Sequence, residues 1–168
     1  APHFNNGTAN CEGTEEPFDI VVNPDAHVDK PGDQILCNGF ETNPITFTTL
    51  NSVGTMTYTW TNDHPEIGLA ATGTGHIALF TATNTSKSPI LATITVTPAF
   101  SNLGKTCNGT SKDFTILVNP TAELDQPDDQ VVCNGESTDF VDFVSQNLGG
   151  TMSYTWTNSN TTIGLVAL

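Results

Sequence analysis

The chain has 168 residues, 36% of them hydrophobic, which is enough for one or two packed domains. It contains 18 acidic and 4 basic residues, all four of them lysines, and carries a formal net charge of −14. Such a chain repels polyanions and lacks arginine for bidentate phosphate contacts, so nucleic acid is excluded as a partner. No run of about 18 apolar residues occurs, so direct membrane insertion is not expected.

Alternation of large apolar and polar residues predicts the strands. Met56, Tyr58 and Trp60 fall on one face of segment 55–61 and threonines fall on the other, as in a half-buried strand. The other segments with this pattern are 18–22, 45–47, 77–84 and 92–97. No segment has a convincing helical period, so the sequence predicts an all-β protein.

The chain repeats itself at a constant offset of 96 residues, with about half of the aligned positions identical. Three pairs of distinctive residues mark the offset: Cys11 and Cys107, Cys37 and Cys133, and Trp60 and Trp156. This period is too long for a solenoid unit and fits a complete β-sandwich domain, so we expect tandem immunoglobulin-like modules. The expected core residues are Tyr58 and Trp60, with Tyr154 and Trp156 in the second copy.

Each Val-Asn-Pro sequence, ending at Pro24 and Pro120, restricts the backbone after a strand and therefore suggests a module boundary. Residues 1–24 are expected to be the last strand and preceding loop of an earlier module. Residues 25–120 form one complete sandwich, and residues 121–168 form the first half of the next.

The motifs C-N-G-E, T-Y-T-W-T-N, I-G-L-A-A-T-G-T-G, F-T-A-T-N, A-T-I-T-V-T-P and F-T-I-L-V-N-P are spread over the whole chain. Together they resemble the PKD-like and immunoglobulin-like repeats of large secreted surface proteins from Bacteroidetes-type bacteria. The resemblance implies an extracellular or cell-surface stalk, adhesin or filament module, usually present in many copies. It implies no catalytic residues.

Four cysteines in an acidic, threonine-rich and apparently secreted chain predict disulfides, because such compartments are oxidising. Three pairings remain open. The nearest cysteines in sequence close short loops, Cys11 with Cys37 and Cys107 with Cys133. Cys37 with Cys107 requires the 101–113 loop to fold down the sheet. A staple between neighbouring modules joins the first-turn cysteine of one module to the last-loop cysteine of the next.

No catalytic motif of the serine hydrolase, zinc protease, P-loop or Cys-His type occurs, so the sequence predicts neither an enzyme nor a cofactor. Asp125, Asp128 and Asp129 are weak calcium candidates, although a solvated turn explains them better. Four Asn-x-Ser/Thr patterns mark possible glycosylation sites, at Asn6, Asn84, Asn108 and Asn160.

Three functions fit these features. The first is a structural or adhesive surface protein whose repeated rigid modules set its reach. The second is a carbohydrate- or calcium-binding accessory module of a secreted hydrolase. The third is a fibre subunit that polymerises by strand exchange between chains. The expected partners are neighbouring copies of the module or chain, with glycans or other cell surfaces as further possibilities.

Overall fold

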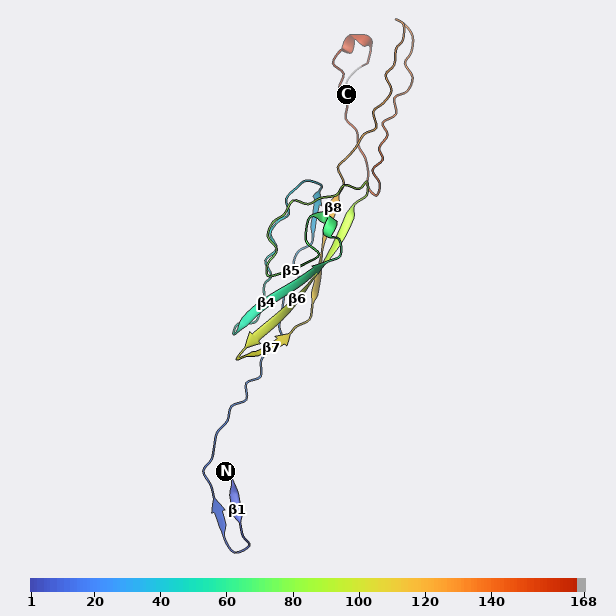
Figure 1. Ribbon diagram of the computed structural model, residues 1–168. Helices are drawn as coiled ribbons and strands as arrows, with labels where there is room; N and C mark the ends of the chain where they lie inside the picture. Colours follow the sequence, from blue (N-terminus) through green and yellow to red (C-terminus); the bar gives the residue numbers. More distant parts are fainter. Residues whose placement is uncertain (166–168) are drawn as a thin grey trace.

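The computed structural model describes residues 1–165, and the chain is elongated, with one β-rich module between two extended ends (Figure 1). The buried hydrophobic residues of the described chain all lie between Ala26 and Val118, and we use the predicted bounds 25–120 to refer to this module. The elements in chain order are β1 (His3–Asn5), β2 (Asn10–Glu12), β3 (Gln34–Cys37), β4 (Thr55–Asn62), η1 (Pro65–Ile67), β5 (Thr72–Thr74), β6 (Ile90–Asn102), β7 (Lys105–Asn108), β8 (Lys112–Asn119) and η2 (Thr161–Ile163). The protein is therefore all-β, with two short 3-10 helices among the described residues. None of its helices over residues 1–165 has the length and apolar character needed to cross a membrane.

The main sheet has the strand order β3-β8-β6-β4-β5, and β7 pairs with the far end of β6. The pairs are antiparallel except β3 with β8, which run parallel from Gln34 opposite Ile116 to Cys37 opposite Asn119. The long strand β6 is central because it pairs with β8 along its first half, with β4 along most of its length and with β7 at its end.

Period-two alternation explains why this sheet has one buried face. Phe114, Ile116 and Val118 of β8 are 0% exposed, and the intervening residues of that strand are partly exposed. On β6, Ala92, Ile94 and Val96 are likewise fully buried. At about 25 cal/mol per Å² of apolar surface, such residues supply most of the favourable free energy of folding.

Two extended segments, 40–47 and 76–82, lie against this face and share its core. They run antiparallel and are joined by isolated bridges, Glu41 with Thr81 and Ile45 with Ile77. Ile45 and Ile77 belong to the same hydrophobic cluster as the strands of the main sheet. The predicted strands at 45–47 and 77–84 are thus extended segments without a continuous ladder. Pro44, which has no N–H to donate, interrupts the pairing.

The two ends of the chain carry less regular structure. The hairpin of β1 and β2 pairs Phe4 with Cys11, which is the register in which β6 and β7 pair Phe100 with Cys107. The equivalent residues of the two hairpins are separated by 96 positions in the sequence. Segment 101–113, expected to be a loop, contains β7, because the turn at Leu103 and Gly104 adopts left-handed backbone angles (φ 49° and 77°).

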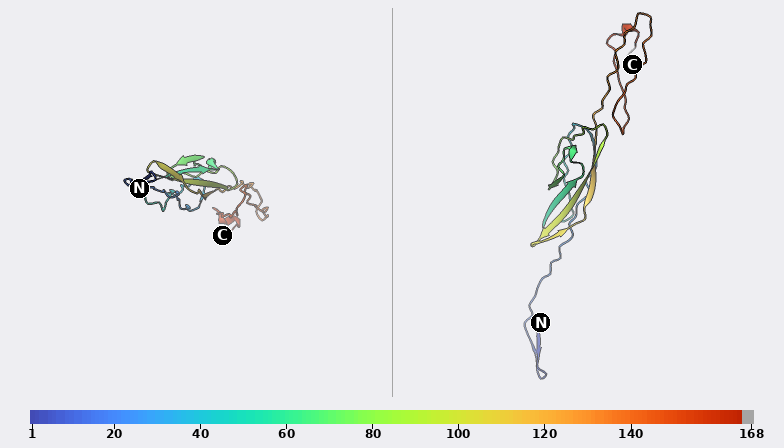
Figure 2. Two further views of the ribbon diagram at one scale, coloured as in Figure 1. Left: turned by 90° about the horizontal axis from the view of Figure 1, so that it is seen from below. Right: turned by 45° about the vertical axis from the view of Figure 1, so that its right-hand side comes forward.

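Segment 18–22, predicted as a strand, is extended but has no strand partner, and residues 121–165 contain η2 and no strand. The right-hand view of Figure 2 shows both ends projecting away from the module. The last three residues of the expected half-module 121–168 lie outside the described residues.

Replacing Trp60 with Ala is expected to lower the free energy of unfolding of the module by about 3–5 kcal/mol, because it empties a large core site. Trp60 is 8% exposed and belongs to the central cluster. Thermal or urea denaturation measures the loss. His64→Ala, at a half-buried residue outside the hydrophobic cluster, is the control. Equal destabilisation by the two changes contradicts the assignment of Trp60 to the core.

Gly73→Ala is expected to destabilise the module by about 1–3 kcal/mol through overpacking. Gly73 pairs with Trp60, and an added Cβ would lie 2.0 Å from Trp60 Cζ2. Gly32→Ala is the matched control, because an added Cβ there has no heavy atom within 4 Å. Denaturation midpoints that shift equally for both variants rule out this close approach.

Candidate functional site

The two ends of the module, where the chain enters and leaves it, hold the main polar contacts between the module and the rest of the chain. At the entry, Asn23 Nδ2 donates to the carbonyl oxygen of Asn102 at 3.1 Å, and Asn102 Nδ2 donates to Asn23 Oδ1 at 2.9 Å. These reciprocal amide bonds fix the incoming chain beside the β6–β7 turn. A shallow hollow there is lined by Val21, Val22, Asn23, Asn102, Leu103, Lys105 and Cys107.

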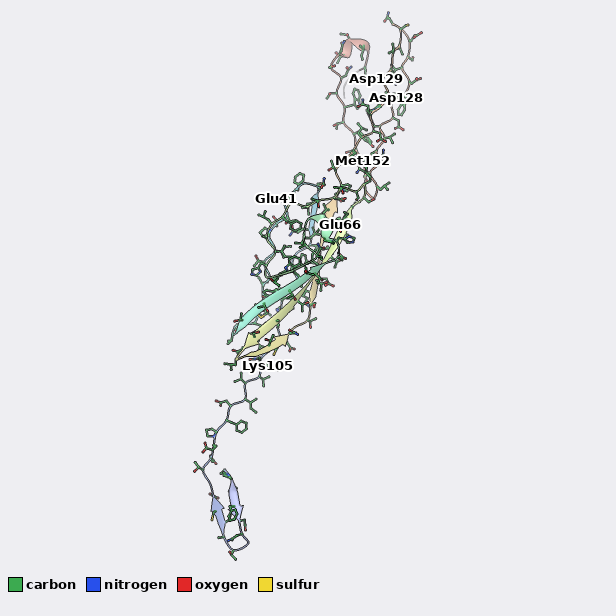
Figure 3. All side chains as sticks on the ribbon, viewed as in Figure 1. Glu41, Glu66, Lys105, Asp128, Asp129 and Met152 are labelled. Carbon is green, nitrogen blue, oxygen red and sulfur yellow. The ribbon has the colours of Figure 1, made fainter. Side chains whose placement is uncertain are left out.

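At the exit, different residues join the module to the following segment. Lys87 forms an ion pair with Glu123, and its carbonyl oxygen accepts the backbone N–H of Leu148 at 2.8 Å. Asn38 Nδ2 donates to Thr121 Oγ1 at 2.9 Å. Figure 3 shows Met152 at this end of the module and Lys105 at the opposite end. The chain therefore passes through the module from one end to the other.

The four cysteines are free thiols, three of them exposed and Cys107 half-buried. Cys107 lies opposite Phe100, near the end of β6. Val118 of β8 lies opposite both Leu36 of β3 and Ile90 of β6, so Leu36 is level with Ile90 at the start of β6. Cys37 follows Leu36, so about ten strand positions, or roughly 33 Å, separate it from Cys107 along the sheet. A disulfide needs Cα atoms within about 7 Å, so this geometry excludes the pairing of Cys37 with Cys107 inside one module.

The pairings that are short in sequence are also far apart in space. Cys11 lies on the N-terminal hairpin, which projects beyond the entry end, and Cys37 lies near the exit end (Figure 1). Cys107 lies near the entry end, and Cys133 lies in the segment beyond the exit. Of the three pairings that the sequence leaves open, only a disulfide between neighbouring modules joins cysteines at adjoining ends.

The expected core aromatics have different surroundings in the two copies. Tyr58 is 7% exposed and packs against Phe47, with ring centroids 5.3 Å apart. Tyr154 is 37% exposed and retains the equivalent neighbour, Phe143, at 5.6 Å. Trp60 is buried, whereas Trp156 is half-buried. The half-module thus keeps its internal aromatic pair but lacks the sheet that covers it.

The acidic residues do not converge on a cation site. Asp128 and Asp129 project from the C-terminal segment (Figure 3), and Asp125 Oδ1 accepts a hydrogen bond from Gln146. Across residues 1–165 no three His, Cys, Asp or Glu side chains are grouped to hold a metal ion. Asp33 instead accepts the backbone N–H of Thr115 at 2.7 Å, and this bond is the main cause of its lowered pKa.

The pKa of one histidine, His64, is raised above its usual value. A hydrogen bond between His64 Nδ1 and Glu66 Oε1 at 2.7 Å raises the pKa of the imidazole and lowers the pKa of the carboxyl. The stabilisation from the raised imidazole pKa is fully present below the unfolded-state pKa of histidine and is lost as the pH rises through the folded-state pKa. Both side chains are about half exposed, so the pair is a surface contact.

Three of the four possible glycosylation sites are exposed, at Asn6, Asn108 and Asn160. Asn84 is 2% exposed, and its amide nitrogen donates to the carbonyl oxygens of Ser88 at 2.9 Å and Val118 at 2.7 Å. In the folded module this nitrogen has no room for a glycan. Asn84 instead ties the loop before β6 to the end of β8.

Sequence reasoning missed the entry hollow, because its residues are far apart in the chain. Asn23 and Asn102 are separated by 79 positions, and only the strand register brings them together. The available signal was that Asn23 belongs to a Val-Asn-Pro sequence that recurs 96 residues later.

Comparisons with protein-family models, with curated proteins and with solved structures find no match for this chain.

A fragment of residues 25–120 is expected to melt cooperatively, whereas a fragment of residues 121–168 is expected to be disordered or to aggregate. All of the buried hydrophobic residues over positions 1–165 lie between Ala26 and Val118, so only the first fragment contains a core. Circular dichroism with a thermal melt of each fragment measures this. A cooperative transition in the shorter fragment contradicts the module boundaries.

Proposed function

We propose that this chain is a non-enzymatic structural or adhesive part of an extracellular stalk, adhesin or filament, in which modules follow one another in series. The observation that carries the proposal is the path of the chain, which enters the module beside Cys107 and leaves it beside Cys37 at the opposite end. A module threaded in this way transmits a pulling force along its strands.

The pairing of β3 with β8 supports a load-bearing role. These strands are parallel and belong to the entering and leaving parts of the module, so tension between its ends shears them past each other. Shear loads all of the interstrand bonds together, whereas peeling breaks them one at a time. Two further bonds extend this ladder, from Thr115 N to Asp33 Oδ1 at 2.7 Å and from Asn38 N to the carbonyl oxygen of Asn119 at 2.8 Å.

The composition is consistent with a surface location. A net charge of −14 keeps neighbouring chains soluble and apart, and threonine on the wet face of the strands suits an exposed sheet. Neighbouring modules are the proposed structural partners, and glycans or other cell surfaces are the proposed adhesive targets.

Force spectroscopy on the full chain, with handles at residues 24 and 120, tests the load-bearing role. Forced unfolding is governed by the unfolding rate. We expect one sharp unfolding event, and we expect Asp33→Ala to raise the unfolding rate at fixed force several-fold by removing the bond to Thr115.

Asp63→Ala is the matched control. Asp63 Oδ1 also accepts a backbone N–H, from Thr93 at 2.6 Å, but it lies outside the β3–β8 pair. Equal effects of the two changes, or the absence of a force peak, contradict the proposed role.

A fibre subunit that exchanges strands between chains is the second candidate function. It is favoured by segment 18–22, whose apolar side chains have neither strand partners nor cover, since such an edge is a template for another chain.

A further inference from the structure

The loop of residues 84–89, which we name the exit loop, contacts the second copy of the repeat. Lys87 pairs with Glu123, and the carbonyl oxygen of Lys87 accepts the backbone N–H of Leu148 at 2.8 Å. Successive repeats therefore touch through groups that lie outside the linker connecting them.

This contact is close-packed as well as polar. An added Cβ at Gly149 would lie 3.1 Å from Pro89 Cδ. Met152, which Figure 3 shows at the exit end, lines the hollow beside Pro89. Asn38 Nδ2 donates to Thr121 Oγ1 at 2.9 Å at the same end of the module.

The second copy is anchored at this contact in the same way as the complete module. Asn147 Nδ2 donates to the carbonyl oxygen of Thr121 at 2.9 Å, and Asn147 Oδ1 accepts the backbone N–H of Glu123 at 2.7 Å. Asn51, 96 positions earlier, makes both bonds with the equivalent residues, at 3.0 Å and 2.8 Å. The residues that meet the exit loop thus have the bonding of a complete repeat, and they do not depend on the strands that follow.

The entry end of the module shows a different contact between successive repeats. Asn23, just before Pro24, is joined to Asn102 on the β6–β7 turn by two reciprocal amide bonds. Asn119, just before Pro120, occupies the equivalent position at the exit. In a continuous series of modules, Asn119 is therefore placed to bind the β6–β7 turn of the module that follows.

We infer that every joint between successive modules carries both contacts, so that the exit end of one module and the entry end of the next form a fixed interface. The inference rests on the serial arrangement proposed above and adds the surfaces through which the modules meet. The exit surface consists of Asn38, Lys87, Pro89 and Asn119. The entry surface consists of the residues equivalent to His27, Ser52 and Asn102.

Two contacts from separate elements restrict the joint more than either contact alone. A single contact leaves rotation about the linker, whereas the exit loop and the β6–β7 turn together oppose it. The linker prolines, Pro24 and Pro120, also fix one backbone angle each. The joint is therefore stiff, and the direction of one module sets the direction of the next.

The charges at the joint offset the repulsion between acidic modules. Lys87 is one of four basic residues in a chain of net charge −14, and it lies against Glu123 of the next repeat. The side chains of the pair are 41% and 52% exposed, so salt weakens the attraction. The backbone bond to Leu148 and the packing on Pro89 do not rely on charge.

Hydrogen exchange of the Leu148 amide in the full chain, measured by NMR, tests the first contact. We expect protection of at least about tenfold over an unstructured peptide. Glu123→Lys should raise the exchange rate several-fold, because it places two lysines together. The double change Lys87→Glu with Glu123→Lys should restore protection, which a merely unfolded segment would not do. Lys30→Glu, at a lysine that pairs with Asp33 inside the module, is the control and should have no effect.

A chain lengthened after residue 168 by residues 73–120 tests the whole joint. Positions 168 and 72 are equivalent, so the addition completes the second repeat in register. In a weakly aligning medium, one alignment tensor should fit the backbone residual dipolar couplings of both modules. Asn119→Ala should separate the two tensors, because it removes the bond to the second β6–β7 turn. Asn23→Ala, which removes the equivalent bond outside this joint, is the matched control and should leave one tensor.

An unprotected Leu148 amide in both chains overturns the inference, as do separate alignment tensors for the two modules of the unmodified lengthened chain. Protection of Leu148 that appears only in the lengthened chain supports it. The load-bearing role fails separately, by loss of the force peak of a single module.

Discussion

The burial of β8 is the constraint on which the rest of the structure depends. Its apolar face is completely covered, and its two edges pair with β6 and β3. Because β8 is also the last strand before the chain leaves, its position fixes the exit at the end opposite the entry. Residues 18–22, located 96 positions earlier than the middle of β8, have the same pattern of apolar residues but no strand partner among the described residues.

Much of the fold could be predicted from local pattern. Alternation identified the central strands at 55–61 and 92–97, because a pleated strand sends alternate side chains to opposite faces. The parallel pairing of β3 with β8 could not be predicted, since Gln34 and Ile116 are distant in sequence and short strands carry little register information. Segment 18–22 has the alternating pattern of a strand, yet it has no strand partner among the described residues. Local sequence pattern does not predict which strands pair.

The candidate site follows the same division. The sequence predicted that the four cysteines form disulfides, but it left three pairings open. Strand register excludes the pairing of Cys37 with Cys107 inside the module and places Cys107 beside Asn23. The repeat then relates Asn23 to Asn119, the register partner of Cys37.

The central claim is that the apolar pattern shared by residues 18–22 and β8 forms a stable strand only where neighbouring strands pair with it. Hydrogen–deuterium exchange on the reduced full chain measures this directly, because amide protection reports the free energy of opening. In dilute solution the amides of residues 18–23 should exchange at unprotected rates, whereas those of Phe114, Ile116 and Val118 should be protected to the level of global unfolding. Full protection of residues 18–23 in the monomer would contradict the account.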